Sequence, residues 1–332
     1  MERSRVLTKA FLFFYLLFCS IPIAHCKALV TCGPFSKIYD PSIGESLLWY
    51  INDHTIVCGS DGWHLFGITH TEPANPMDEK NFAHATANNL KQQYWIKQTF
   101  SLTYSPTDSE RILWAPHVVY SNGLFYMYYC VGTMDDDHTK FRIHLATSPD
   151  LWKWTRNKQN PMVVDGYDAR DPMIVRLDTC WAMYYCATST QSGGNHVVNM
   201  LHSSDLIHWD NRITVFTDSI KGTYGGPTES PFIVRRGSKY YLFTCTNSPY
   251  NTTRVMVSSS PYQWSFDSIV GTFPAHAAEI VRDFDGKWYI TRAGWGEGGV
   301  YIAPLTWNDG LDSVSSSMCA SSGVNLRWDV EK

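Results

Sequence analysis

Three acidic residues, Asp53, Asp171 and Glu229, lie near the start of a hydrophobic phrase that the chain repeats, and they are the first candidates for chemistry. A carboxyl group that stays protonated can donate a proton, while an ionised one can accept a proton or attack a carbon atom. Carboxylates at nearly matched repeat positions therefore predict acid–base chemistry if the fold brings them together. The five copies of the phrase occur at residues 51–57, 114–119, 169–175, 228–234 and 276–281.

Each copy of the phrase runs through a turn into a short strand rich in tyrosine and tryptophan. A period of about 50 to 65 residues with two strands in each copy is typical of a propeller. The sequence thus predicts an all-β fold, a five-bladed β-propeller. Since the innermost strands of a propeller line its central channel, acids that are far apart in the sequence are expected to form one site. The aromatic strands occur at residues 63–66, 125–129, 181–185, 240–243 and 288–290.

The repeat fills the chain, so one propeller domain is expected at residues 47–312. A lead-in at 27–46 precedes it, and a polar tail at 313–332 follows it. A second phrase, rich in serine and ending in tryptophan, recurs at 145–154, 201–209 and 255–264 and is interpreted as a structural turn. Helices should be few, because no stretch shows a sustained 3.6-residue period. The expected blades are 47–105, 110–162, 168–222, 226–272 and 275–312.

Charge and composition exclude some partners. The net charge is −4 and the isoelectric point is near 6.3, which gives no basic footprint for nucleic acid or acidic lipid. Aromatic residues make up 14% of the chain, with 13 tryptophans. Most of these should pack the blades, and others offer flat faces on which sugar rings stack. Nothing in the sequence sets the oligomeric state.

Residues 1–26 have the features of a secretory signal peptide. A basic start is followed by an apolar run from Ala10 to Ala24 and by small residues before a cleavage site. The alternative is an uncleaved anchor, although the run is shorter than the roughly 20 residues of a membrane helix. A secreted, extracellular protein is expected. Asn251, in an Asn-x-Thr motif, is then a candidate for N-glycosylation.

Seven cysteines remain after removal of the signal peptide, and an oxidising compartment permits disulfide bonds between them. Three of them end aromatic strands in successive blades and are expected to be buried thiols. Pairing of Cys32 with Cys319, or of Cys32 with Cys58, is a hypothesis. No cysteine and histidine spacing indicates a zinc site. The three buried thiols are Cys130, Cys186 and Cys245.

These motifs resemble the five-bladed propeller glycosidases of glycoside hydrolase families 43 and 32. The resemblance covers residues 49–307. Segments 52–53 and 170–172 are similar to both families, whereas the Trp-Ala-Pro at 114–116 is similar to family 43. The resemblance implies an active site made of Asp53, Asp171 and Glu229. The chain departs from the pattern at one place, because His54 follows Asp53 where a proline is usual.

The resemblance also implies a role for each acid. Glu229 is the expected general acid that protonates the leaving oxygen, and Asp171 tunes Glu229 and holds a sugar hydroxyl group. Asp53 is the expected base of an inverting reaction, as in family 43, or the nucleophile of a retaining one, as in family 32. The Trp-Ala-Pro motif favours family 43 and inversion. Acids clustered in a narrow channel raise one another's pKa values, which suits this chemistry.

Further candidates surround these acids. Arg170, His117, His54 and Trp295 are expected to contact sugar. His276 occupies the position of Glu229 in the last blade, where the resemblance implies help in holding a central calcium or other ion together with water molecules. A histidine bonded only to its neighbours is the alternative, and no cofactor is required.

The sequence therefore predicts a secreted glycoside hydrolase that cleaves furanoside or pentoside linkages in glycans bearing arabinose, xylose or fructose. The alternative is a propeller that binds carbohydrate without catalysis, which His54 favours. A third reading, a protein-binding propeller of the WD kind, is disfavoured, because its Gly-His and Trp-Asp signature is absent.

Overall fold

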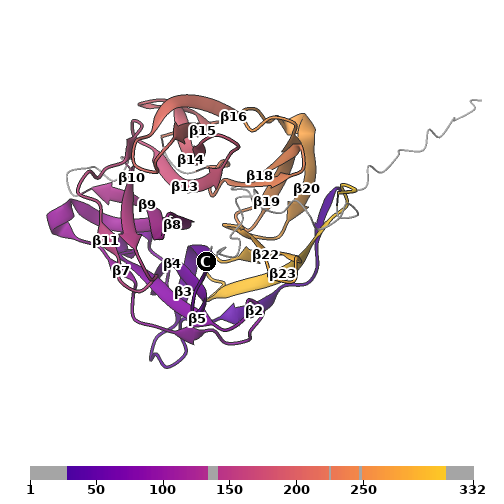
Figure 1. Cartoon of the computed structure of the whole chain (residues 1–332). Helices are drawn as coiled ribbons and strands as arrows, with labels where there is room; N and C mark the ends of the chain where they lie inside the picture. Colours follow the sequence, from indigo (N-terminus) through magenta and orange to yellow (C-terminus); the bar gives the residue numbers. More distant parts are fainter. Residues whose placement is uncertain (1–27, 134–140, 224–225, 247–248, 312–332) are drawn as a thin grey trace, which may run out of the picture.

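The five-bladed propeller is confirmed. The computed structural model describes residues 28–133, 141–223, 226–246 and 249–311, and the regular structure of these residues is β-strand apart from three short 3-10 helices. The strands form five antiparallel sheets around a central axis (Figure 1). Neighbouring strands of each blade are mostly consecutive in sequence, because tight turns connect them.

The strands of each blade and the helices have the following bounds. Blade one contains β3 (Trp49–Gly59), β4 (Gly62–Thr71), β5 (Asn81–Ala87), β6 (Ile96–Lys97) and β7 (Leu102–Thr103). Blade two contains β8 (Glu110–Ser121), β9 (Leu124–Thr133), β10 (Phe141–Ser148), β11 (Thr155–Arg156) and β12 (Val163–Val164). Blade three contains β13 (Ala169–Arg176), β14 (Trp181–Thr190), β15 (Gly193–Ser203) and β16 (Asp210–Gly222). Blade four contains β17 (Phe232–Arg236), β18 (Lys239–Cys245), β19 (Thr253–Ser258) and β20 (Ile269–Phe273). Blade five contains β21 (Ile280–Arg282), β22 (Trp288–Arg292) and β23 (Val300–Trp307), and the 3-10 helices are η1 (Pro76–Asp78), η2 (Pro106–Asp108) and η3 (Phe266–Ser268).

The ring closes through its N-terminal segment. Strands β1 (Val30–Cys32) and β2 (Ser36–Tyr39) both pair with β23, so part of the expected lead-in completes blade five. Val30 pairs with Trp307 and is 1% exposed. Pairing the first strands with the last blade removes the open edge that β23 would otherwise present.

The serine-rich phrase forms a turn that packs on its own blade. Ser148 Oγ accepts a hydrogen bond from the backbone N–H of Leu151 at 2.9 Å, and Ser203 Oγ accepts one from Leu206 at 2.8 Å. Both leucines have a left-handed backbone, with φ of 67°, and are buried. The repeated phrase therefore fixes a turn and contributes to the core.

One hypothesis about the cysteines is wrong, and several other predictions concern segments outside the described residues. Among the described residues, no disulfide joins Cys32, at the end of β1, to Cys58 in β3. The proposed signal peptide, the polar tail after residue 312 and Cys319 lie outside the described residues. In the described part of the chain, no helix is long and apolar enough to span a membrane.

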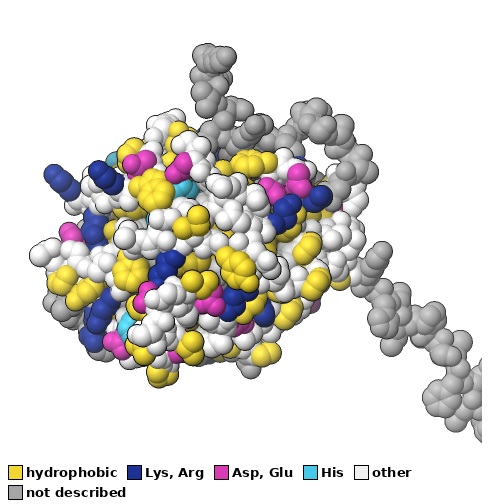
Figure 2. Space-filling model, turned by 90° about the horizontal axis from the view of Figure 1, so that it is seen from below, with side chains coloured by type: hydrophobic (Ala, Val, Ile, Leu, Met, Phe, Trp, Pro, Cys, Tyr) yellow, Lys and Arg dark blue, Asp and Glu magenta, His cyan; other side chains and the backbone are white. Residues whose placement is uncertain are grey.

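Basic side chains do not gather on the face seen in Figure 2. Lysine and arginine side chains are scattered there among acidic and apolar ones. Many basic side chains of the described residues are paired with acids, as in the contacts Lys37–Asp40 at 3.1 Å and Arg236–Asp309 at 2.8 Å.

Candidate active site

The innermost strands of blades one, two and three carry a β-bulge near the axis. In β3 the pairing passes from Ile51 to His54, an advance of three residues, while β4 advances by two. Strands β8 and β13 shift in the same way. A bulge bends its strand and re-aims the side chains it carries. The acids of the repeat therefore project from a break in the ladder.

The three acids occupy consecutive positions around this break. Glu229 corresponds to Arg170, because each pairs with the cysteine that ends the next aromatic strand. Asp171 is the first residue of its bulge and Asp53 is the second. The repeat thus brings the three acids close to one level of the propeller. Their register positions differ by one residue from Glu229 to Asp171 and by one more from Asp171 to Asp53.

This stagger explains why His54 can replace proline. The register sets Asp53 level with Pro172, and His54 is already back in the ladder, where blade three has Met173. The residue after Asp53 is therefore not the counterpart of the proline after Asp171.

The backbone at the first bulge position is left-handed in four blades. The φ angles are 46° at Ala115, 54° at Asp171, 49° at Ser230 and 47° at Ala277. A non-glycine residue adopts this conformation at a cost in energy, and only where the surroundings hold it. The direction of the Asp171 side chain is thus set by a constrained backbone.

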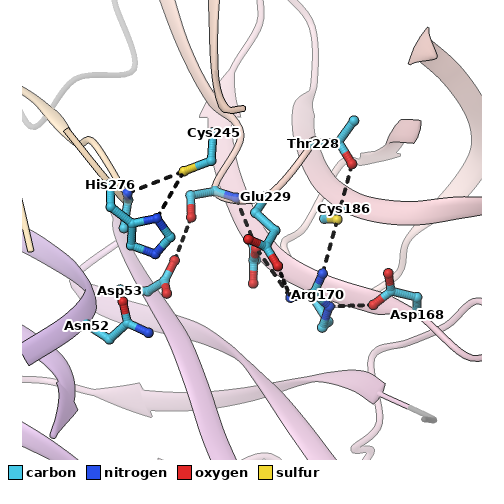
Figure 3. Close-up of polar contacts among 12 residues, drawn as sticks. Asn52, Asp53, Asp168, Arg170, Cys186, Thr228, Glu229, Cys245 and His276 are labelled. Carbon is cyan, nitrogen blue, oxygen red and sulfur yellow. Dashed lines mark hydrogen bonds and ion pairs between the residues drawn. The ribbon is translucent and has the colours of Figure 1, made fainter. Parts of the chain in front are cut away.

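The three acids line one cavity of about 440 Å³. Arg170, Trp295 and His276, also predicted from the sequence, belong to the same lining, and Figure 3 shows several of these side chains converging. His54 and His117 are not brought into this cavity. They line an adjoining space of about 30 Å³, which Asp53 and Asp171 also border. There His54 Nε2 lies 2.8 Å from Thr291 Oγ1, and His117 Nε2 lies 3.2 Å from the carbonyl oxygen of Ile174.

Ser230 ties two of the acids together. Its hydroxyl group donates a hydrogen bond to Asp53 Oδ1 at 2.6 Å, and its backbone N–H donates one to Asp171 Oδ2 at 2.9 Å. Because Ser230 directly follows Glu229, a single dipeptide contributes one acid and positions the other two. This role of Ser230 was not predicted from the sequence, although the residue lies inside the repeated phrase.

Arg170 joins the carboxylates electrostatically. The guanidinium is 4% exposed and lies 2.5 Å from Asp168, 3.3 Å from Glu229 and 3.8 Å from Asp171. A buried cation of this kind is stable only when it is paired. Asp168 holds the guanidinium from behind, and burial raises the pKa of Asp168 to about 6 although Arg170 opposes the rise.

Burial and neighbouring charges shift the pKa values of the acids in the cavity. Burial raises the pKa of Glu229 above that of an ordinary glutamate, Arg170 opposes the rise, and the Asp171 charge adds to it. Burial also raises the pKa of Asp171, with Arg170 opposing and Asp53 adding. Glu229 is therefore a carboxyl group that holds its proton to higher pH, as a proton donor must.

Three stacked rings form one wall of the cavity. The ring of Tyr250 lies 3.9 Å from that of His276 and 5.3 Å from that of Trp295, and in both pairs the planes are nearly parallel. Trp295 is 37% exposed, which leaves part of its indole available to a sugar ring. His276 Nδ1 lies 3.3 Å from the carbonyl oxygen of Tyr250 and 3.6 Å from Cys245 Sγ.

The residues around His276 do not fit a direct calcium site. Calcium takes six to eight oxygen ligands, whereas the histidine offers nitrogen. Among the residues that the structure describes, no three His, Cys, Asp or Glu side chains are grouped so as to hold a metal ion.

A fourth carboxyl group in the cavity was missed by the sequence analysis. Glu79 follows η1, is 1% exposed and lines the cavity with Asp53. Its Oε1 accepts hydrogen bonds from the Tyr50 hydroxyl at 2.8 Å and from Trp295 Nε1 at 2.9 Å. Burial raises the pKa of Glu79 to about 8. No sequence signal could single it out, since it lies outside both repeated phrases.

The chain is similar to known carbohydrate-active proteins. Residues 158–327, about half of the chain, match the family model of glycosyl hydrolases family 43. This match includes Asp171 and Glu229 but not Asp53. A curated relative, the extracellular exo-alpha-(1->5)-L-arabinofuranosidase ArbA of Cellvibrio japonicus, is 24% identical over 238 residues, which cover 63% of this chain and 64% of the relative. The chain therefore spans less than two thirds of the length of this relative.

Solved structures share the fold at low identity. An endo-arabinase from Bacteroides thetaiotaomicron is 15% identical, with a TM-score of 0.64 over 83% of this chain and 99% of its own. A family-43 beta-xylosidase/alpha-arabinofuranosidase from a compost microbial metagenome is 15% identical, with a TM-score of 0.59 over 84% and 94%. A family-32 beta-fructofuranosidase from Bombyx mori is 17% identical, with a TM-score of 0.56 over 78% and 61%.

Proposed function

The chain belongs to family 43 of the glycosyl hydrolases, and on that premise we propose that it hydrolyses O-glycosyl bonds with Asp53, Asp171 and Glu229. The observation that carries the proposal is the meeting of these three acids in one cavity, two of them held by Ser230. A propeller that only binds carbohydrate has no need of a carboxyl group with a raised pKa beside two further acids.

Glu229 acts as the general acid in this proposal. Burial favours its protonated form, so it can donate its proton to the leaving oxygen. Once the proton has left, the Arg170 guanidinium at 3.3 Å stabilises the carboxylate. Arg170 also approaches the sugar, since it lines the cavity.

Asp53 acts as the general base of an inverting reaction. It deprotonates a water molecule that attacks the anomeric carbon on the face opposite the leaving group. The Ser230 hydroxyl group directs one oxygen of Asp53, at 2.6 Å, and leaves the other for the water. Asp171 raises the proton affinity of Glu229 and accepts a hydrogen bond from a sugar hydroxyl group.

The proposed substrates are furanosides or pentosides in glycans that bear arabinose or xylose. Three features support this substrate class. The cavity has a volume of about 440 Å³ and a stacked aromatic wall, and the relatives are named arabinofuranosidase, xylosidase or arabinase. We propose a secreted protein, in line with the extracellular relative ArbA. Asn251 is exposed in the turn before β19 and is the proposed site of N-glycosylation. No cofactor is proposed.

A substrate panel tests the proposal. The full chain is incubated with 4-nitrophenyl α-L-arabinofuranoside, 4-nitrophenyl β-D-xyloside and, as a fructoside, sucrose. We expect sugar release from at least one of the two nitrophenyl pentosides. Release of fructose from sucrose alone would contradict the proposed substrate class. Binding of arabinose or xylose without release from any substrate would favour the non-catalytic propeller.

A further inference from the structure

The two carboxyl oxygens of Glu79 have different surroundings, because only Oε1 accepts hydrogen bonds from the Tyr50 hydroxyl and from Trp295 Nε1. Oε2 accepts neither of these two hydrogen bonds. It is also not one of the buried polar atoms that lack a hydrogen-bond partner. The Trp114 indole lies beside the carboxyl group and opposes the rise in its pKa that burial causes. Glu79 also lines the cavity close enough to Asp53 for the Asp53 charge to raise its pKa. Oε2 is therefore the oxygen that a ligand in the cavity can reach.

Blades one and five are joined on the side of the cavity where Glu79 lies. Trp295 Nε1 reaches across to Glu79 at 2.9 Å, the backbone N–H of Gly296 donates to Glu72 Oε1 at 3.0 Å, and that of Gly294 donates to the carbonyl oxygen of Ile51 at 2.9 Å. These three bonds hold the segment after β22 against blade one. Of the three, the bond between Trp295 and Glu79 joins residues that line the cavity, and a glycan chain that passed between these two side chains would have to break it.

The position of the proton donor assigns the two sides of the cavity. Glu229, which protonates the leaving oxygen, belongs to blade four, whereas Glu79 and Trp295 belong to blades one and five. The leaving oxygen must therefore lie next to Glu229 to receive its proton. Glu79 and the indole remain to contact the sugar ring whose bond is cleaved.

Resting on the proposed glycosidase function, we propose that Glu79 is a specificity-determining residue: its Oε2 hydrogen-bonds a hydroxyl group of the sugar ring, and together with Trp295 it closes the cavity to all but a terminal ring. A site built to hydrogen-bond a hydroxyl group discriminates strongly against an analogue that lacks it, because a buried polar group is then left without a partner. Tyr50 and Trp295 fix the direction of the carboxyl group before the sugar arrives.

The hydroxyl contact is tested by pairing enzyme variants with substrate analogues. The wild type and Glu79→Ala are each assayed with the nitrophenyl pentoside that the wild type hydrolyses and with its monodeoxy analogues. For one analogue we expect a loss of kcat/KM of roughly tenfold to hundredfold in the wild type and a loss several times smaller in Glu79→Ala. Equal losses in both enzymes for every analogue would show that Glu79 makes no contact with the sugar.

A conservative variant covers the case in which Glu79→Ala does not fold. Glu79→Gln keeps the shape of the side chain and cannot ionise. The KM of the wild type is expected to change as the pH rises through about 8, the value to which burial raises the pKa of Glu79, and the KM of Glu79→Gln is expected not to change there. The matched control is Glu72→Gln, which also removes one carboxylate, can still accept the bond from Gly296 and should retain the pH dependence. A Glu79→Gln profile identical to that of the wild type would overturn the proposal.

Product analysis tests the closed end. Linear arabino- and xylo-oligosaccharides are incubated with the wild type, and the products are separated by chromatography. Single sugars should appear first, whereas an early mixture of shorter oligosaccharides would contradict a closed cavity.

Failure of the proposed function would be recognised separately. If the wild type hydrolyses nothing, titration with L-arabinose and D-xylose, followed by calorimetry, still tests Glu79. Binding that Glu79→Gln weakens at least severalfold supports the contact. Equal binding by both proteins, or none by the wild type, overturns it.

Discussion

Glu229→Gln should lower the turnover of glycosides with poor leaving groups by roughly 10² to 10⁴-fold, the contribution of a general acid. Glutamine has the size of glutamate but carries no transferable proton, so the leaving oxygen departs as an anion. Oligosaccharides have such leaving groups, whereas 2,4-dinitrophenolate leaves without a proton. The measurement is kcat/KM of the variant on an oligosaccharide and on the dinitrophenyl glycoside of the same sugar.

The two substrates form an internal control for this variant. A large loss on the oligosaccharide with a small loss on the dinitrophenyl glycoside identifies Glu229 as the proton donor. Equal losses on both would remove Glu229 from that role and leave it as a binding residue. Circular dichroism shows whether the variant retains the propeller. We expect it to, since the Glu229 side chain is partly exposed and, among the described residues, its hydrogen bond is to Arg170.

Asp53→Asn should abolish hydrolysis of every substrate, whatever its leaving group. Asparagine cannot accept the proton of the attacking water, and this step is common to all substrates of an inverting glycosidase. Ligand binding should survive, because the amide can still accept the hydrogen bond from Ser230. The measurement is the rate on the oligosaccharide and on the dinitrophenyl glycoside, with sugar binding followed by calorimetry.

Asp285→Asn is a suitable control for the loss of a negative charge. Asp285 lies in the exposed turn between β21 and β22 and outside the cavity, so its removal should leave both rates unchanged. Retained activity in Asp53→Asn would mean that the acid of blade one has no chemical role. Residue 53 lies outside the segment that matches the family model, which makes this variant the more informative of the two.

The fold could be predicted because the sequence signal of each blade lies within the residues of that blade. Each blade needs its own aromatic strand and its own turn, and the serine turns at Ser148 and Ser203 recur with nearly the same hydrogen bonds. The completion of blade five by β1 and β2 was not predicted, because the pairing of these strands depends on contacts with the far end of the chain. Strand pairing between the two ends of a chain leaves no periodic signal in its sequence.

The site could be predicted only in part. Matched positions brought Asp53, Asp171 and Glu229 into one cavity, but the stagger between them depends on bulges that the sequence does not reveal. His54 and His117 lie one or two residues past this level and bond to the protein instead. Glu79 comes from a 3-10 helix outside the repeat, where only the folded structure shows what the side chain faces.

The most direct test of the account is a proton NMR spectrum of the first sugar released by the wild type. The proposed water lies between Asp53 and the sugar, so the hydrolysis product should first appear as the anomer opposite to that of the substrate. Mutarotation mixes the anomers later, so the spectrum is recorded in the first minutes. A first product that keeps the configuration of the substrate would make Asp53 a nucleophile and contradict the account.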